Sequence, residues 1–349
     1  MAKLTDTAAL STVVLPPGHP PVLPQRIGLL LVNLGTPEAT TYWPMRRYLK
    51  EFLSDRRVIE VNRFLWWLIL NLVILTIRPK KSGHAYEAIW NRERNESPLK
   101  TFTRGQAEGL QRAFSDQVIV DWSMRYGFPK IAERLQALKD RGCDRVLVFP
   151  LYPQYSAATT ASVMDKLGLA LAAMRWQPAI RVVPPYFDES VFIETIAASL
   201  KDYLKKLGWK PDRILMAFHG LPKEYLDKGD PYHCQCQKTA RLVRQKMGMS
   251  GDELQLVFQS RFGRAEWLQP YAQDTVEKLP AQDVKNLLMI SPGFASDCVE
   301  TLEELSIGLK ETFEEHGGEN FSVVPCLNDS AASLVMLEKL VRNELKGWL

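Results

Sequence analysis

The sequence predicts an α/β protein built from two similar domains, each with a parallel sheet, that face a central cleft. Two observations indicate this fold. Apolar segments typical of strands alternate with charged amphipathic segments typical of helices, which is the pattern of parallel sheets covered by helices. In addition, short motifs in the first half recur in the same order in the second half. The length of 349 residues suits two domains of about 150 residues each.

Six segments carry the strand signal. Each is a short apolar run, and several are followed by an amphipathic stretch with helical spacing. The six segments are residues 27–33, 118–121, 145–150, 213–219, 254–259 and 286–291. A further helical pattern over residues 330–346 predicts a C-terminal helix that packs back on the first domain.

Three pairs of segments define the internal repeat, and in the second pair Arg125 matches Arg261. The pairs are residues 31–37 with 216–222, 123–127 with 259–263, and 146–150 with 287–292. The repeat predicts two α/β domains, a cluster of prolines predicts a flexible tail before them, and the helical pattern predicts a C-terminal helix after them. Their expected bounds are 1–25 for the tail, 26–180 and 181–326 for the domains, and 327–349 for the helix.

Composition excludes several classes of function. The net charge of +4 comes without long Lys/Arg blocks, so no nucleic-acid partner is expected. Five cysteines, odd in number and unevenly spaced, do not form a disulfide pattern, which favours a reducing, cytoplasmic location. Phosphate-binding glycine loops do not occur in the sequence, so a nucleotide cofactor is not expected.

Residues 64–77 form an unusually apolar segment with cations at both ends. Its fourteen residues are fewer than the roughly 17 that a bilayer-spanning helix needs. The alternatives are therefore a buried core helix and a helix that lies in a membrane interface. The adjacent tryptophans Trp66 and Trp67 favour a surface that touches lipid or an apolar ligand.

Three carboxylates follow the last predicted strand. At about 100° per residue, Asp297, Glu300 and Glu304 share one face of a helix. A solvated face is the ordinary explanation of such a pattern. The location argues for more, because ligands of parallel sheets bind beyond the carboxyl ends of strands, where acids can hold a cation or move protons.

His219 ends the fourth predicted strand and is the candidate partner of these acids. A lone histidine at such a place is often a hydrogen-bonded packing residue. Beside Asp297 and Glu300 it becomes a base or a loose metal ligand with open coordination positions. The matching position in the first half is Leu34, so the first half is neutral where the second carries imidazole.

Two further groups leave alternatives open. Arg125 and Tyr126, just past a strand, can bind a ligand carboxylate or form a surface ion pair. Cys234 and Cys236 beside a histidine suggest a metal cluster, but such a centre normally needs four ligands, and free thiols explain the pattern better.

Several motifs, in this order along the chain, resemble the ferrochelatase family, whose members insert ferrous iron into a porphyrin. They are Val32-Asn-Leu-Gly-Thr-Pro37, Met124-Arg-Tyr126, Tyr152-Pro-Gln-Tyr-Ser156, Phe218-His-Gly-Leu-Pro222, Gly229-Asp-Pro-Tyr232 and Phe258-Gln-Ser-Arg-Phe-Gly263, together with Ile290 to Leu305. The resemblance covers about residues 27–345. It implies two flavodoxin-like, doubly wound domains around a porphyrin cleft, as in chelatases.

The resemblance also implies roles for individual residues. His219 and Glu300 would bind the iron and handle protons, with Asp297 nearby and Glu304 continuing the acidic line. The apolar walls would be Leu34, Trp267 and Phe294, and the groups that meet propionates or line the pocket would be Arg78, Lys81, Arg125, Tyr126 and Ser260. Residues 64–77 would be a hydrophobic lip that contacts the inner face of a membrane.

The implied reaction inserts Fe²⁺, as substrate, into protoporphyrin IX to give protohaem, the last step of haem biosynthesis. The alternatives are a chelatase for coproporphyrin or another divalent metal, and a non-catalytic bilobal haem- or metal-binding protein. The chain departs from animal members at Cys298, where they have histidine, and at Ala157, where they have cysteine. It also has no cysteine-rich extension, so the animal [2Fe-2S] cluster is not expected.

Overall fold

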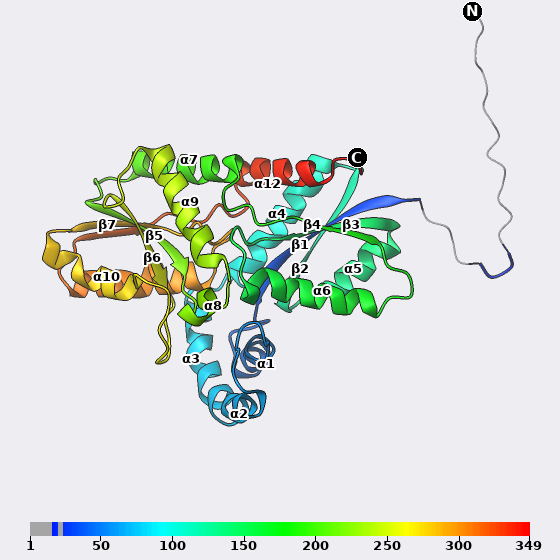
Figure 1. The fold of residues 1–349 in the computed structure, drawn as a ribbon, viewed down its shortest axis with the longest axis horizontal. Coiled ribbons are helices and arrows are strands. Elements are labelled where there is room, and N and C mark those ends of the chain that lie inside the picture. Colours follow the sequence, from blue (N-terminus) through cyan, green and yellow to red (C-terminus); the bar gives the residue numbers. More distant parts are fainter. Residues whose placement is uncertain (1–15, 20–23) are drawn as a thin grey trace, which may run out of the picture.

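The computed structural model describes residues 16–19 and 24–349 of the chain and contains two parallel four-stranded sheets with helices around them (Figure 1). Most of the predicted tail, residues 1–25, lies outside the described residues. The strand order is β2-β1-β3-β4 in the first sheet and β6-β5-β7-β8 in the second. Because the two orders correspond strand for strand, the predicted duplication of an α/β domain is confirmed.

All six predicted strands are present, and each sheet has one further edge strand. The first sheet comprises β1 (Arg26–Thr36), β2 (Val118–Gly127), β3 (Cys143–Pro150) and β4 (Ala179–Val182). The second comprises β5 (Arg213–His219), β6 (Leu254–Gln259), β7 (Asn286–Ile290) and β8 (Asn320–Val323). Strand β4 runs two residues past the expected domain boundary at residue 180, because its pairing with β3 continues to Val182.

The helices connect the strands in the order that βαβ units require. The first half contains α1 (Tyr42–Leu53), α2 (Arg63–Ile69), η1 (Leu70–Ile74), α3 (Leu75–Ala88), α4 (Pro98–Phe114), α5 (Ile131–Asp140), η2 (Ala157–Ala161) and α6 (Ser162–Ala172). The second contains α7 (Ser190–Lys206), α8 (Lys223–Asp227), α9 (Tyr232–Met247), α10 (Ala272–Lys278), η3 (Pro280–Gln282), η4 (Glu300–Leu309), α11 (Lys310–Glu315) and α12 (Ala331–Glu344). Segments η1, η2 and η4 are π-helical, and η3 is a 3₁₀ turn.

The register of the two sheets corrects one detail of the predicted repeat. Met124 and Phe258 occupy equivalent places, because the strand residues that they pair with are equivalent. Each also donates its backbone N–H to a proline carbonyl oxygen at 2.8 Å. The predicted match of Arg125 with Arg261 is therefore wrong by two residues. Arg125 lies within β2, whereas Arg261 lies beyond the end of β6 at Gln259.

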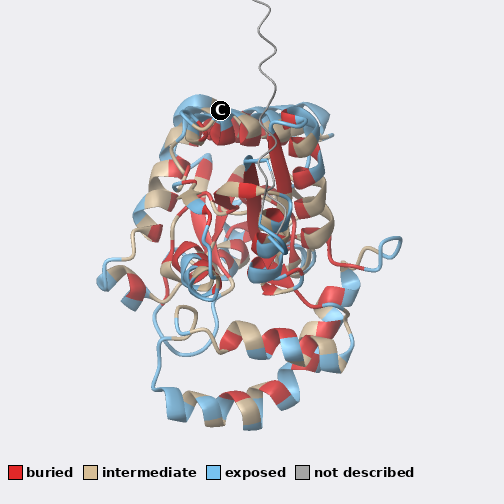
Figure 2. Cartoon of the chain, turned by 90° about the vertical axis from the view of Figure 1, so that its right-hand side faces the viewer, coloured by how far each residue is buried: buried red, intermediate tan, exposed pale blue. Residues whose placement is uncertain are grey.

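The two sheets share one hydrophobic core. In β1, Leu29 and Leu31 face that shared core, while Leu30 and Val32 face a second cluster formed with α5 and α6. The shared core also contains residues of α4, α7, α9 and α12 and the inner face of the second sheet. Figure 2 shows the buried residues concentrated between the sheets and their covering helices. This common core holds the carboxyl ends of both sheets on the same side of the molecule.

The C-terminal helix α12 lies across both halves, next to α4 and α7. Its position requires small residues on α4, since a side chain at Gly109 would collide with Leu334. Beyond the helix, the ring of Trp348 lies 4.2 Å from the guanidinium of Arg181, which also donates to the Glu344 carbonyl oxygen at 2.8 Å. The end of the chain is thus bound to β4 of the first sheet.

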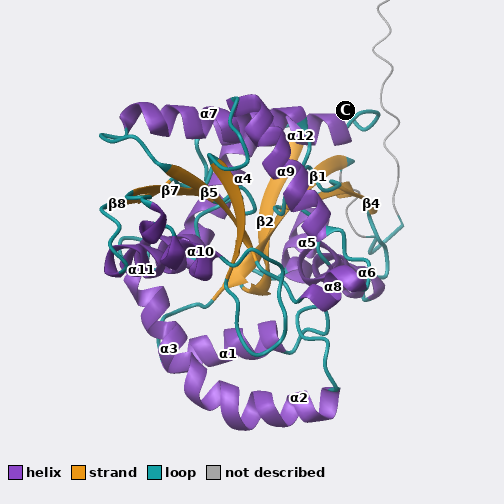
Figure 3. Cartoon of the chain, turned by 60° about the vertical axis from the view of Figure 1, so that its left-hand side comes forward, coloured by secondary structure: helices purple, strands orange, loops and turns teal. Residues whose placement is uncertain are grey.

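The predicted lip is a helical arm that projects away from the sheets (Figure 3). It runs through α2 and η1 into α3, and most of its apolar side chains face outward. Phe64, Leu72 and Ile77 are 74%, 65% and 69% exposed, whereas Leu70 and Leu75 are buried against α1. Burial in the core therefore accounts only for the apolar residues on the face toward α1, and the apolar residues on the outer face are exposed. Among the described residues, no helix is both long and apolar enough to cross a membrane.

A buried ion pair fastens the lip to the first sheet. The carboxylate of Asp55, just after α1, forms an ion pair with Arg125. It also accepts hydrogen bonds from Tyr126 Oη at 2.8 Å, Ser162 Oγ at 2.6 Å and the Arg57 backbone N–H at 2.8 Å. Burial acts to raise the pKa of Asp55, but these hydrogen bonds and the Arg125 charge outweigh it and lower the pKa. The group is therefore ionised and fully bonded in the folded protein.

We expect Asp55→Ala to lower the free energy of unfolding by about 3–5 kcal/mol, because removal of one partner leaves the buried guanidinium of Arg125 unpaired. Urea unfolding followed by circular dichroism measures the change. Asp165→Ala is the control, since Asp165 pairs with Arg57 at the surface and should contribute about 0–1 kcal/mol. Equal losses in the two variants would contradict this account of the lip anchor.

Candidate active site

A cavity of about 1170 Å³ lies at the carboxyl ends of the two sheets and extends to Val61 and Arg78, which flank the lip. Its size suits a large ligand, because sites for small molecules usually occupy about 300–1000 Å³. Eight of the residues predicted for the site line it. They are Leu34, Arg78, His219, Ser260, Trp267, Phe294, Glu300 and Glu304.

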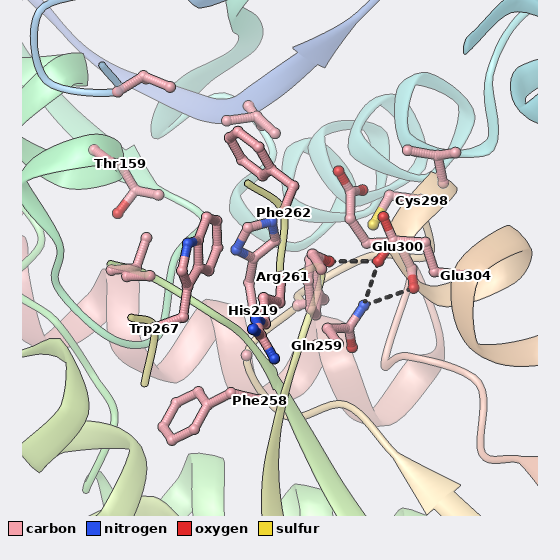
Figure 4. A pocket seen from close by; sticks show the side chains of 18 of the residues that line it. Thr159, His219, Phe258, Gln259, Arg261, Phe262, Trp267, Cys298, Glu300 and Glu304 are labelled. Carbon is pink, nitrogen blue, oxygen red and sulfur yellow. Dashed lines mark hydrogen bonds between the residues drawn. The ribbon is translucent and has the colours of Figure 1, made fainter. Parts of the chain in front are cut away.

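His219 is the last residue of β5 and extends from the buried strand into the cavity (Figure 4). Its Nδ1 lies 2.6 Å from the Gly220 carbonyl oxygen. Because a carbonyl only accepts, Nδ1 carries a proton, so in the neutral form of the ring the lone pair lies on Nε2. Nε2 can therefore accept a proton or bind a metal ion without any change at Nδ1. The equivalent residue of the first half, Leu34, forms an apolar part of the wall.

The acids of the site lie on a π-helix, η4, whose first residue is Glu300. A π-helix has i→i+5 hydrogen bonds and a wider turn than an α-helix, and such turns are frequent at functional sites. The wider turn brings residues four apart more nearly into line, so Glu300 and Glu304 both face the cavity. Glu303, which the sequence analysis did not single out, also lines it.

Glu304 has a half-buried carboxyl group that is held by two neighbours. Ser260 Oγ donates to its Oε2, and Gln259 Nε2 lies 3.4 Å from the same oxygen (Figure 4). Burial raises the pKa of Glu304, and the charge of Glu300 raises it further, against the lowering effects of Ser260, His219 and Gln259. The group therefore exchanges protons at a higher pH than an exposed glutamate does.

The side chain of Glu300 has neutral neighbours. Burial raises the pKa of Tyr86 well above its ordinary value, and the charge of Glu300 adds to this effect. Burial and then the charge of Glu300 do the same for the thiol of Cys298. Both groups stay protonated at neutral pH, so Cys298 is a thiol and not a thiolate ligand.

Asp297 is placed differently from the prediction. Its carboxylate accepts from Thr301 Oγ1 at 2.9 Å, Asn328 Nδ2 at 2.7 Å and the Cys326 backbone N–H at 3.3 Å. In the described part of the chain it is not among the residues that line the cavity. The expected common face of Asp297, Glu300 and Glu304 is wrong for Asp297, because η4 begins only at Glu300 and helical spacing does not apply before it.

Three residues that were predicted to bind substrate, two cations and one phenol, also lie elsewhere. Within the described residues, Arg125, Tyr126 and Lys81 do not line the cavity. Arg125 and Tyr126 belong to the Asp55 anchor, where their polar groups are occupied. Lys81 is exposed on α3, and its charge opposes the rise that burial causes in the pKa of Glu303.

Sequence analysis missed several lining residues of the loop that follows β6. Arg261, Phe262 and Arg264 line the cavity, and the ring of Phe262 lies 5.6 Å from the guanidinium of Arg78 on α3. Gln259, the last residue of β6, lines it as well. The signal was the motif of residues 258–263, from which only Ser260 was assigned a role.

The chain contains five cysteines. All five are free; Cys234 is exposed on α9, and Cys236 is buried in the shared core. Across residues 16–19 and 24–349, no three His, Cys, Asp or Glu side chains converge as a group that could hold a metal ion.

The chain is similar to known chelatases in sequence and in fold. Solved structures that resemble it include SirB from Bacillus subtilis with Fe³⁺, with a TM-score of 0.55 and 13% identity over 91% of this chain and 95% of that one. Another is the sirohydrochlorin chelatase SirB from Bacillus subtilis subspecies spizizenii in complex with cobalt. It has a TM-score of 0.53 and 11% identity, over 92% of this chain and 96% of that one. At these identities the likeness concerns the fold alone.

Sequence relatives are much closer. A protein named Ferrochelatase from Agrobacterium fabrum is 55% identical over 337 residues, which is 96% of this chain and 98% of the relative. A protein of the same name from Rhizobium meliloti is 56% identical over 333 residues, which is 95% of this chain and 98% of the relative. The model of the family Ferrochelatase matches residues 26–345. The chain therefore belongs to the ferrochelatase family.

Proposed function

We propose that this protein inserts ferrous iron into protoporphyrin IX and releases two pyrrole protons, which gives protohaem in the last step of haem biosynthesis. The observation that carries the proposal is the pairing, in one cavity, of a histidine with an available Nε2 lone pair and a line of carboxyl groups. Membership of the ferrochelatase family supports the same reaction.

The reaction needs a proton acceptor and donors for the entering cation. The two inner N–H groups of a porphyrin must lose their protons as the metal enters. His219 and Glu300 share metal binding and proton abstraction in this proposal, since a neutral Nε2 and a carboxylate oxygen each suit both functions. Glu304, whose pKa is raised, receives protons from this pair and passes them along η4.

Asp297 acts indirectly in this proposal. Its hydrogen bonds to Thr301 and Asn328 hold the turn from which Glu300 projects. We therefore regard Asp297 as a positioning residue rather than a member of the acidic line.

The walls of the cavity suit a flat apolar macrocycle that bears carboxylates on one edge. Leu34, Trp267 and Phe294 supply apolar surface, and Arg78 offers a cation to a propionate. The proposal assigns no propionate to Arg125, Tyr126 or Lys81.

Two alternatives are separated by turnover. A chelatase for coproporphyrin or for another divalent metal would show a higher kcat/KM with that substrate than with protoporphyrin and Fe²⁺. A non-catalytic haem- or metal-binding protein would bind porphyrin without accelerating formation of the metalloporphyrin absorption bands.

The proposed cellular location of the protein depends on the lip. We propose a cytoplasmic enzyme that rests on the inner face of a membrane through the exposed side chains of residues 64–77, with cations such as Arg63 and Arg78 at its ends. Iron enters this proposal as substrate, without a [2Fe-2S] cluster. The domains of the proposal are residues 26–182 and 183–326, with α12 bridging them.

His219→Ala should lower kcat for Fe²⁺ insertion by about 10²–10⁴-fold, the usual contribution of a general acid or base. Porphyrin affinity, measured by fluorescence quenching, should stay within about threefold. The rate is followed by the appearance of haem absorption under anaerobic conditions. His316→Ala, at an exposed residue next to α11, is the control. Wild-type turnover by His219→Ala would refute the proposed site.

Glu304→Gln should lower kcat yet stabilise the fold at pH 8. The folded-state pKa of Glu304 is raised above 4.5, so its charge costs stability that grows as the pH rises from the unfolded value to the folded-state pKa and is complete above it. The gain in melting temperature should shrink as the pH is lowered through the folded-state pKa, because the wild-type group becomes protonated. Glu311→Gln, at an exposed residue of α11, should change neither quantity. A lower melting temperature for Glu304→Gln at pH 8 would contradict the assignment.

Ile77→Ser should weaken binding to phospholipid vesicles by about 10–100-fold, because burial of an isoleucine side chain contributes about 1.5–3 kcal/mol. Co-sedimentation with vesicles measures the change. Leu169→Ser on α6 is a matched control, since Leu169 and Ile77 are both 69% exposed but only Ile77 belongs to the lip. Equal effects of the two substitutions would argue against a membrane role of the lip.

A further inference from the structure

We infer that Gln259 is a positioning residue for iron insertion, which holds the start of η4 and the carboxylate of Glu304 in one fixed arrangement. The inference rests on the role proposed for Glu304 above. Gln259 carries no charge and does not belong to the acidic line, so its contribution is geometric.

The geometry assigns both contacts to a single amide nitrogen. Gln259 Nε2 lies 2.8 Å from the Glu300 carbonyl oxygen and 3.4 Å from Glu304 Oε2 (Figure 4). The Glu300 carbonyl oxygen only accepts hydrogen bonds, so the NH₂ group of Gln259 faces it and the orientation of the amide follows. The side chain is buried, with Gln259 only 4% exposed. The end of β6 is thus tied to the backbone and to an acid of the π-helix.

Ser260 completes this attachment, because its hydroxyl donates to the same oxygen of Glu304. Gln259, the last residue of β6, and Ser260, which follows it, therefore both hold the carboxylate of Glu304. Among the described residues, loss of Gln259 would leave Ser260 as the remaining hydrogen-bond donor to Glu304. The carboxylate could then leave the line that it forms with Glu300.

The first domain supports a common origin for this arrangement. The corrected register makes Arg125 the equivalent of Gln259, since Met124 and Phe258 correspond. Arg125 Nε donates to the carbonyl oxygen of Ser162, which directly follows the π-helix η2, at 2.8 Å. In both halves, the same strand position thus ties the strand to the helical region beyond the third strand, at the start of α6 just after η2 in the first half and at the start of η4 in the second.

The difference between the two halves has a chemical reason. Arginine in the first domain also forms an ion pair with a carboxylate, that of Asp55. A cation at the equivalent place in the second domain would pair with Glu304 and keep it ionised. A neutral amide holds Glu304 by a hydrogen bond and leaves its charge available for proton exchange.

A double-mutant cycle tests the inference. Gln259→Met keeps the length and volume of the side chain but removes both hydrogen bonds. In the wild-type background it should lower kcat by about tenfold or more and leave KM for protoporphyrin within twofold. In the Glu304→Gln background, the same substitution should change kcat less than twofold, because Gln259 acts through Glu304. Melting curves verify that each variant is folded.

Gln255→Met is the matched control, at a half-buried position of the same strand outside the cavity lining. If Gln259→Met fails to fold, Gln259→Asn replaces it in the double-mutant cycle, because the shorter side chain cannot reach both hydrogen-bond acceptors. Equal losses of kcat in the two backgrounds, or wild-type kcat for the single variant, would overturn the inference. Wild-type kcat for Glu304→Gln would instead overturn the role proposed for Glu304, and this inference with it.

Discussion

The hydrophobic core between the two sheets is the constraint on which the site depends. Apolar residues of β1, β5 and their neighbours meet helices α4, α7, α9 and α12 in one continuous cluster. Separation of the sheets would expose this cluster to water, at a cost of about 25 cal/mol for each Å² of apolar surface. The core therefore fixes the strand ends that deliver Leu34 and His219 to one cavity.

Duplication followed by divergence explains the chemistry of that cavity. Equivalent positions carry a leucine and a histidine at the ends of β1 and β5, and an arginine and a glutamine near the ends of β2 and β6. Each domain also has a π-helix beyond its third strand, but only η4 brings acids to the cavity. One domain thus supplies apolar wall and a mount for the lip, and the other supplies the groups that can bind a cation or accept protons.

Much of this arrangement could be predicted from the sequence, because strands buried on both faces are nearly continuous apolar runs. The edge strands β4 and β8 escaped prediction, since each has only four residues and is merely half-buried at most positions. The π-helices could not be predicted from a period of 3.6 residues, and Asp297 was placed on a shared helix face because the sequence does not show that the helix begins only at Glu300. Gln259 was not predicted because an uncharged amide in a sequence does not indicate a functional role. Its role is apparent only from the contact with η4 in the structure.

The Asp55 anchor means that the lip is mechanically a part of the first domain. Its segment after α1 reaches the second domain through side chains at the cavity rim, such as Tyr225 Oη, which donates to the Val58 carbonyl oxygen at 2.9 Å, and Lys228, which pairs with Glu60. These contacts involve few groups, and the Lys228–Glu60 pair is partly open to water, although Tyr225 is buried. The chain thus joins a firmly mounted lip to the opposite rim by few contacts, so the opening of the cavity can loosen without any disturbance of His219 and its acids.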